Sequence, residues 1–344
     1  MAAAKNNRGF SSLKKDISEN KIGRLYLFEG EESYLKEYYL NLLSEKLIPK
    51  GNESFNLHIY DERSINPDSL LDSVESLPVM SDRKLVIIRD FDILKADSSI
   101  KPMLTDLFSD LPEYICLVFL YDTIEFKADS RQKIYKLLQE NGSVCEFPLQ
   151  ENHDLIPWIK RRFSSLGRTI SSSDAEYLIF LCGRSMVNLS GEISKIAAYS
   201  RSSSITRADI DDTAVPVPDA VIYELTDALS SRDFAKAHEA ADRLLSMRID
   251  SIALTSSIGR QVRQLYSACL CLKNGKGKQH LMDIWKFRSS YPAERLLKSA
   301  SSLNLAWCRS AIRLCASADL KLKSSSVDKE QTVRLLLSQL SLNI

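Results

Sequence analysis

The first candidate for chemistry is a glycine turn, Gly30–Lys36, which follows a short apolar run. Phosphate-binding loops have the pattern G-x-x-x-x-G-K-[ST], whose backbone amides cradle phosphates while the lysine neutralises them. Here a single glycine is preceded by Glu29 and followed by Glu31 and Glu32. Three carboxylates would repel a polyphosphate. We therefore expect a degenerate loop that binds no nucleotide, and the rest of the chain indicates no cofactor.

Other side chains that could do chemistry are scattered. No histidine has a metal-like partner four residues away or lies in a nucleophile motif; the four are His58, His153, His238 and His280. The seven cysteines sit in apolar runs without a C-x-x-C pair, which predicts buried reduced thiols rather than disulfides or zinc. Asp90 and Asp92 follow an apolar run, but without a phosphate loop they are expected to be ordinary carboxylates. We predict no catalytic residue and no metal.

The composition is that of a soluble globular protein. The chain has 344 residues, of which 44% are hydrophobic and 26% charged, and its length predicts two or three domains. No apolar run approaches the roughly 18–20 residues of a membrane span. The N-terminal segment lacks the apolar core of a secretory signal. We expect a cytoplasmic protein.

Charge is distributed unevenly along the chain. The net charge is +1, yet residues 251–344 carry 15 Lys and Arg against 5 Asp and Glu, and the first 250 carry 31 against 40. Such asymmetry can mean that a polyanion faces the C-terminal part, or that neighbouring parts complement one another. The basic cluster that could face DNA consists of Arg260, Arg263, Lys273, Lys276 and Lys278.

The glycine turn belongs to an alternation of apolar strands and amphipathic helices. Strands are predicted at 24–28, 55–60, 85–89, 115–121 and 143–147, with helices at 32–47, 67–77, 100–109 and 130–140. This order indicates a parallel sheet covered on both faces. Strand signals stop after Phe147, so the first domain is predicted to cover residues 1–147.

The remaining chain is predicted to be helical. Residues 148–214 indicate a small helical domain, with helices opened by Pro157 and at 173–181 and 187–199. Val215–Pro218 is an extended linker, because each proline biases the preceding residue away from helix. The last domain, 215–344, is predicted to contain six helices.

The tip segment, Leu77–Lys84, joins a predicted helix to a buried strand. Asn66 caps the helix, Pro67 suits its first turn, and Pro78 ends it after Leu77. Val79 and Met80 have no place in either element. We expect these two apolar side chains to form a protein-binding tip; the alternative is that they plug the edge of the sheet.

Four stretches resemble the delta subunit of the bacterial DNA polymerase III clamp loader, in the right order and over nearly the whole chain. They are Leu25–Leu35, Ser76–Val86, Glu192–Tyr199 and Ala318–Ser324. The resemblance implies an AAA+-like fold: a RecA-like α/β domain, a helical lid and an all-α collar that serves oligomerisation. It further implies a subunit that neither binds nor hydrolyses ATP.

The resemblance also implies partners. The family grips the ring-shaped sliding clamp (beta) and opens it, and its collar assembles with delta-prime and gamma or tau subunits over primed DNA. Its clamp-contacting pair falls on Val79 and Met80, where leucine and phenylalanine are common, and further contacts are expected from Leu77, Ser81 and Arg83. Two other functions stay open at this point: an ATPase with an unusual phosphate site, and a helical adaptor that binds DNA through its basic C-terminal part.

Overall fold

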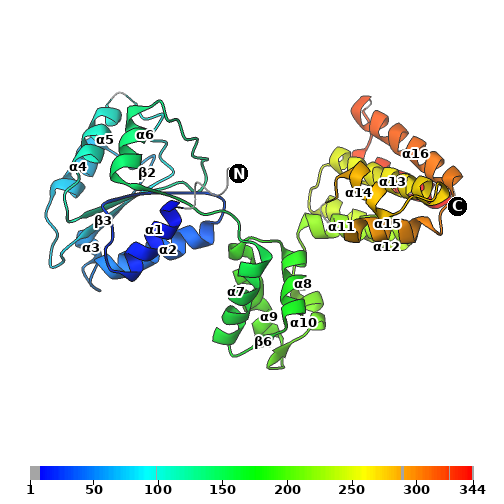
Figure 1. Cartoon of the computed structure of the whole chain (residues 1–344), viewed down its shortest axis with the longest axis horizontal. Helices are drawn as coiled ribbons and strands as arrows, with labels where there is room; N and C mark the ends of the chain where they lie inside the picture. Colours follow the sequence, from blue (N-terminus) through cyan, green and yellow to red (C-terminus); the bar gives the residue numbers. More distant parts are fainter. Residues whose placement is uncertain (1–7, 98, 288–289, 325, 343–344) are drawn as a thin grey trace. The chain divides into compact units, whose positions relative to one another are not determined.

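The computed structural model describes residues 8–97, 99–287, 290–324 and 326–342 (Figure 1). The chain divides into two compact units. The first contains Met1–Glu176 and Arg184–Asp209, and the second contains Tyr177–Gly183 and Ile210–Ile344. The predicted boundaries near residues 147 and 214 remain predictions.

The first unit is built on a five-stranded sheet in the order β2-β3-β4-β1-β5. Its strands are β1 (Leu25–Glu29), β2 (Leu57–Asp61), β3 (Lys84–Arg89), β4 (Ile115–Leu120) and β5 (Ser143–Glu146). All four pairings between neighbours are parallel. The predicted parallel, RecA-like sheet is confirmed, and β2 and β5 are its edges.

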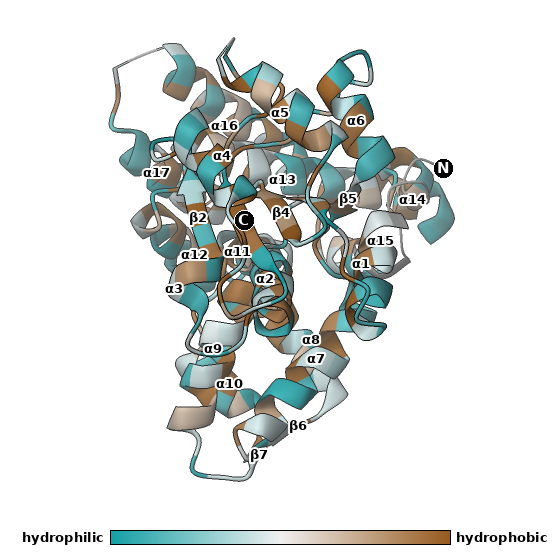
Figure 2. Cartoon of the chain, turned by 90° about the vertical axis from the view of Figure 1, so that its left-hand side faces the viewer, coloured by the Kyte–Doolittle hydropathy of each residue, from teal (hydrophilic) through white to brown (hydrophobic). Residues whose placement is uncertain are grey.

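Helices cover both faces of this sheet. Alternate residues of a strand point to opposite faces, so Leu25 and Leu27 join one apolar core while Tyr26 and Phe28 join the other. The first face packs against α4 (Pro67–Glu75), α5 (Ile100–Ser109) and α6 (Lys133–Asn141), and the second against α1 (Arg8–Ser18) and α2 (Ser33–Leu47). The central strand β4, apolar throughout, is brown in Figure 2.

The rest of the first unit is mainly helical. It includes α3 (Glu53–Asn56), α7 (Asn152–Ser165), α9 (Met186–Tyr199) and a small sheet of β6 (Thr169–Ile170) with β7 (Ser204–Ile205). Two helices, α8 (Ser172–Cys182) and α10 (Arg207–Thr213), have residues in both units. The strand β6 was not predicted, because two residues carry no periodic signal.

The prediction that Pro157 opens a helix is wrong, because α7 begins at Asn152. Leu155, Ile159 and Phe163 are all fully buried at helical spacing, so the apolar face continues across the proline. A proline near the start of a helix removes only one backbone hydrogen bond, and burial of this face outweighs the loss.

The second unit is a helical bundle centred on α13. Its helices are α11 (Pro218–Ser231), α12 (Phe234–Ser246), α13 (Ser251–Lys273), α14 (Lys278–Trp285), α15 (Ser290–Ala300), α16 (Leu305–Ser324) and α17 (Lys329–Leu342). Fully buried Leu254, Ile258, Val262 and Leu265 form the inward stripe of α13. Six helices were predicted and α14 was missed, because it buries only Leu281 and follows two glycines.

The seven cysteines are buried, as predicted. Within the described residues, no helix is both long and apolar enough to cross a membrane. The same part of the chain contains no group of three or more histidine, cysteine or acidic side chains placed to hold a metal ion.

Candidate functional site

The glycine turn lies at the carboxyl end of β1, where a parallel sheet commonly binds its ligand. Gly30 has φ +105°, and a Cβ atom there would lie 2.5 Å from the carbonyl oxygen of Phe147. The Glu32 amide donates a hydrogen bond of 2.9 Å to the same carbonyl. The turn is therefore pressed against the backbone that follows β5, and only glycine fits at its start.

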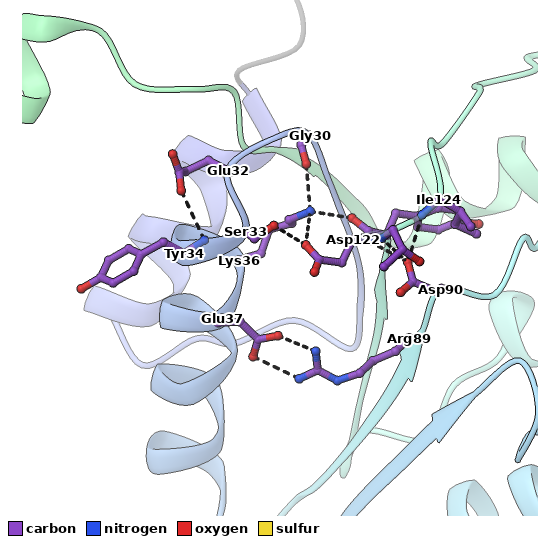
Figure 3. Close-up of polar contacts among 12 residues, drawn as sticks. Gly30, Glu32, Ser33, Tyr34, Lys36, Glu37, Arg89, Asp90, Asp122 and Ile124 are labelled. Atoms are coloured by element: carbon purple, nitrogen blue, oxygen red, sulfur yellow. Dashed lines mark hydrogen bonds and ion pairs between the residues drawn. The ribbon is translucent and has the colours of Figure 1, made fainter. Parts of the chain in front are cut away.

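The space inside the turn is filled by Lys36, which is almost fully buried (Figure 3). Its ammonium nitrogen donates to the carbonyl oxygens of Gly30 at 2.8 Å and Tyr121 at 2.7 Å. It also pairs with the Asp122 carboxylate at 2.9 Å. An ammonium group has three N–H donors, and these three acceptors match that number. The positive charge is thus turned toward the protein's own oxygens.

Lys36 stands six residues after Gly30, the spacing of the lysine in G-x-x-x-x-G-K-[ST]. Leu35 replaces the second glycine, and Glu37 replaces the magnesium-binding serine or threonine. The Glu37 carboxylate forms a two-point ion pair with Arg89 at the end of β3, one contact being 3.0 Å (Figure 3). The degenerate loop stays a prediction, and the aligned lysine was the sequence signal that could have located Lys36.

Two acidic side chains at the turn, Glu32 and Glu29, have surroundings that disfavour their charged forms. Glu32 is buried, and it accepts hydrogen bonds from the backbone amides of Tyr34 and Met186, each at 3.3 Å. Burial nevertheless raises the Glu32 pKa. Burial, with the nearby Glu146 carboxylate, raises the pKa of Glu29 from its usual 4.5 to about 7. These carboxyls give the turn an environment that disfavours additional negative charge.

Asp90 follows β3, at the place where phosphate-loop ATPases keep an acid for magnesium. Its Oδ1 accepts backbone hydrogen bonds from Asp122 and Thr123, each at 2.8 Å, and from Ile124 at 3.3 Å (Figure 3). Partial burial opposes ionisation, but these amide donors outweigh it and hold the Asp90 pKa below its usual range. The carboxylate thus shapes the loop after β4.

The tip segment lies at the opposite, amino-terminal edge of the sheet, between α4 and β3. The helix ends at Glu75, with Ser76 as an extended cap, so the prediction that it continues to Leu77 is wrong. Leu77 therefore belongs to the loop. Three apolar side chains of this loop are exposed to solvent. The exposed fraction is 72% for Leu77, 44% for Val79 and 85% for Met80.

The backbone of the tip segment is fixed although its apolar side chains are exposed. Buried Asn56 of α3 hydrogen-bonds both the amide and the carbonyl of Val79, at 2.9 and 2.8 Å. Asn52 donates to the Met80 carbonyl at 2.8 Å. Met80 has φ +51°, a left-handed conformation that L side chains rarely adopt. Non-glycine residues in such conformations cluster at functional sites.

The polar residues at the end of the tip segment hold it to the sheet. The Arg83 guanidinium donates to the carbonyls of Ile22 at 2.5 Å, Gly23 at 2.8 Å and Ile115 at 2.8 Å. Ser81 donates to Leu47 and to the Arg83 carbonyl. The predicted contacts of Ser81 and Arg83 with a partner stay predictions; in this structure the Ser81 hydroxyl and the two terminal nitrogens of Arg83 bind carbonyls of the protein itself.

Lys84 begins β3 and is also buried. Its ammonium group donates to the Ser76 hydroxyl at 2.7 Å and the Ser76 carbonyl at 3.2 Å, which ties the two ends of the tip segment together. Burial lowers the Lys84 pKa. The loop between α4 and β3 is therefore closed at its base by a side-chain bridge.

The basic cluster predicted to face DNA lies on α13, in the loop that follows it and at the first residue of α14. All five side chains are exposed, and Lys278 pairs with Glu294 at 2.6 Å. Contact with DNA stays a prediction.

The fold and the glycine turn define a class: proteins with a RecA-like parallel sheet whose first turn departs from the phosphate-loop pattern. Residues 26–148 match the family model for the DNA polymerase III delta subunit, and residues 219–340 match the model for the C-terminal domain of that subunit. The chain belongs to the DNA polymerase III delta subunit family.

Individual relatives agree with the family models. The chain is 21% identical to DNA polymerase III subunit delta of Bacillus subtilis over 332 residues, 95% of each chain. It is 25% identical to the probable DNA polymerase III subunit delta of Aquifex aeolicus, covering 71% of this chain and 70% of the relative. The solved structure of the Bacillus subtilis DNA clamp loader delta protein superposes with a TM-score of 0.50 at 20% identity, over 96% of this chain and 99% of that one.

Proposed function

We propose that this chain is the non-catalytic subunit that grips the sliding clamp and opens its ring for loading onto primed DNA. The observation that carries the proposal is the tip segment: exposed Leu77, Val79 and Met80 on a backbone fixed by hydrogen bonds from two asparagine side chains, one of them buried. Apolar anchors on a rigid mount suit insertion into a pocket of a partner.

The absence of catalysis is part of the proposal. Lys36 binds three oxygens of its own chain, and acidic side chains surround the turn. A polyphosphate there would have to displace these contacts and overcome the nearby carboxylates. Equilibrium titration with a labelled ATP analogue tests this point, and tight magnesium-dependent binding would favour the ATPase alternative.

The remaining partners follow from the family. We propose that the chain works in the cytoplasm, and that the second unit assembles with delta-prime and gamma or tau subunits over primed DNA. Its basic cluster, Arg260, Arg263, Lys273, Lys276 and Lys278, is the proposed DNA-facing surface.

The free energy that the tip contributes to clamp binding can be estimated from the apolar surface that it would bury. Burying Val79 and Met80 contributes about 1.5–3 kcal/mol each, so roughly 3–6 kcal/mol together. Nanomolar binding requires about 12 kcal/mol. Leu77 and further contacts supply the difference, and the pair is expected to dominate specificity.

The decisive experiment measures affinity for the sliding clamp of the same organism. Val79→Ser with Met80→Asp should weaken binding at least about a hundredfold, since each 1.4 kcal/mol is a factor of ten. The fold should persist, because both side chains are exposed. The matched control replaces two exposed apolar residues elsewhere in the first unit, Val187→Ser with Leu166→Asp. Clamp binding by the tip variant at the level of this control would overturn the proposal.

A further inference from the structure

The short helix α3 carries an asparagine whose side chain is committed to the tip segment. Asn56 is fully buried, and its carboxamide forms hydrogen bonds in both directions with the backbone of Val79. The Val79 amide donates to Oδ1 at 2.9 Å, and Nδ2 donates to the Val79 carbonyl at 2.8 Å. Nδ2 also donates to the Asn52 carbonyl at 3.1 Å. A carboxamide offers the same donor and acceptor as a peptide group, so Asn56 pairs with Val79 as a neighbouring strand would.

A second asparagine, immediately before the same helix, extends this arrangement by one residue. Asn52, at the start of α3, donates from Nδ2 to the Met80 carbonyl at 2.8 Å. The two asparagines together hold both carbonyls of the Val79–Met80 pair and the Val79 amide. Met80 takes its left-handed conformation directly beside these contacts. The position of its exposed side chain is thus set by α3, about 25 residues earlier in the sequence.

Burial explains why this contact matters. A buried amide that lost its partners would leave donors and acceptors unpaired, which is unfavourable. A change of backbone conformation at Val79 would therefore leave the buried Asn56 carboxamide without its hydrogen-bond partners, which is unfavourable. Exposed apolar side chains on an unfixed loop would instead have to be ordered when a partner binds, and that ordering reduces affinity.

We propose that Asn56, assisted by Asn52, is the positioning residue that keeps the Val79–Met80 tip in its binding conformation before the sliding clamp arrives. This inference rests on the proposed function. Asn56 itself makes no contact with the clamp; it acts through the backbone of Val79.

The test compares clamp binding by Asn56→Ala, Asn52→Ala and the unaltered full-length chain. Loss of both Val79 contacts should weaken affinity about ten- to a hundredfold, because fixing one residue's backbone costs about the free energy of a tenfold change. Asn52→Ala removes only the Met80 contact and should weaken binding about threefold to tenfold. In the tip variant, Val79→Ser with Met80→Asp, adding Asn56→Ala should change nothing further, since its effect passes through the tip.

Two measurements separate positioning from a general loss of stability. Asn141→Ala removes another amide-to-carbonyl hydrogen bond in the same unit, from Asn141 Nδ2 to Phe108 at 3.0 Å, and should leave clamp affinity unchanged. Hydrogen exchange at residues 77–84 should accelerate in Asn56→Ala while β1 and β4 stay protected.

Failure of this inference can be told from failure of the proposed function. If the unaltered chain does not bind the clamp, or the tip variant binds normally, the proposed function is wrong. If the tip variant loses binding while Asn56→Ala and Asn52→Ala both bind within about twofold of the unaltered chain, the positioning role is wrong. If Asn56→Ala does not fold, clamp binding by Asn52→Ala decides the question, because Asn52 is half-exposed and its substitution leaves the fold intact.

Discussion

The glycine turn lies at the carboxyl ends of the strands of one parallel sheet, and the tip segment lies at their amino ends. The side chains of the two regions are arranged in opposite ways. At the carboxyl ends of the strands, buried Lys36 pairs with the partly exposed Asp122 and closes the turn. At the amino edge, buried polar groups fix the backbone while Leu77, Val79 and Met80 face outward. The first arrangement turns the positive charge of Lys36 toward the protein, and the second presents apolar surface to a partner. A sheet of this architecture can thus lack a phosphate-binding turn at the carboxyl ends of its strands and present an apolar binding segment at their amino ends.

This contrast predicts that substitutions in the turn change stability and that substitutions in the tip change binding. Variants of Lys36, of the tip residues and of Glu29 test that separation.

Replacing Lys36 with methionine should destabilise the fold by about 2–4 kcal/mol, because it leaves the carbonyls of Gly30 and Tyr121 without their donor and removes the ion pair with the partly exposed Asp122. Urea denaturation measures this change. Binding to the clamp by the folded fraction should be unaffected. Lys136→Met, at an exposed lysine of α6, is the control and should alter the free energy of unfolding by less than about 0.5 kcal/mol. Equal effects of the two variants would contradict a structural role for Lys36.

Met80→Ala should show the reverse pattern. We expect clamp affinity to fall about tenfold or more, corresponding to roughly 1.5–3 kcal/mol, because Met80 is the most exposed apolar side chain of the tip. Val79→Ala should have a smaller effect, about threefold, since it removes fewer heavy atoms and the side chain is already half covered. Surface-binding assays give the affinities and thermal melting gives stability. A loss of stability without a loss of affinity would remove the contrast between the two regions.

Glu29 provides a pH test of the turn. Its folded pKa of about 7 exceeds the ordinary 4.5, so the folded chain holds this proton more tightly than the unfolded chain does. Stability contributed by this group is therefore present at low pH and lost as pH rises from about 4.5 through 7. Because Glu29 is only partly buried, we expect Glu29→Gln to raise the free energy of unfolding by about 1–2 kcal/mol at pH 8 and hardly at pH 4. An equal change at both values would contradict the raised pKa.

The sequence predicted the sheet well, because its signals are local. The apolar strands β1, β3 and β4 are continuous runs, and helix α5 has the predicted bounds, Ile100–Ser109. The apolar pair Val79–Met80 also stood out locally, since Pro78 separates it from the helix before it. The end of α4 was misplaced by two residues, because the bridge from Lys84 to Ser76 depends on folded geometry.

Contacts between distant residues could not be predicted in this way. Asn56 lies 23 residues before Val79, and Lys36 lies 85 residues before Tyr121. An asparagine or a lysine in such places has no periodic pattern, and only the folded sheet brings the partners together. The sequence therefore predicted which loop was unusual, whereas the residues that hold that loop became apparent only in the structure.

The contact between Gly30 and the Phe147 carbonyl bears on how nucleotide sites are searched for. In a phosphate loop a glycine leaves room for phosphate oxygens, whereas here it leaves room for an oxygen of the chain's own backbone. Substitution by alanine would be resisted in both cases, for unrelated reasons. A glycine at the end of the first strand is thus ambiguous evidence in a genome survey. The residue five positions later, leucine in this chain, discriminates between the two cases.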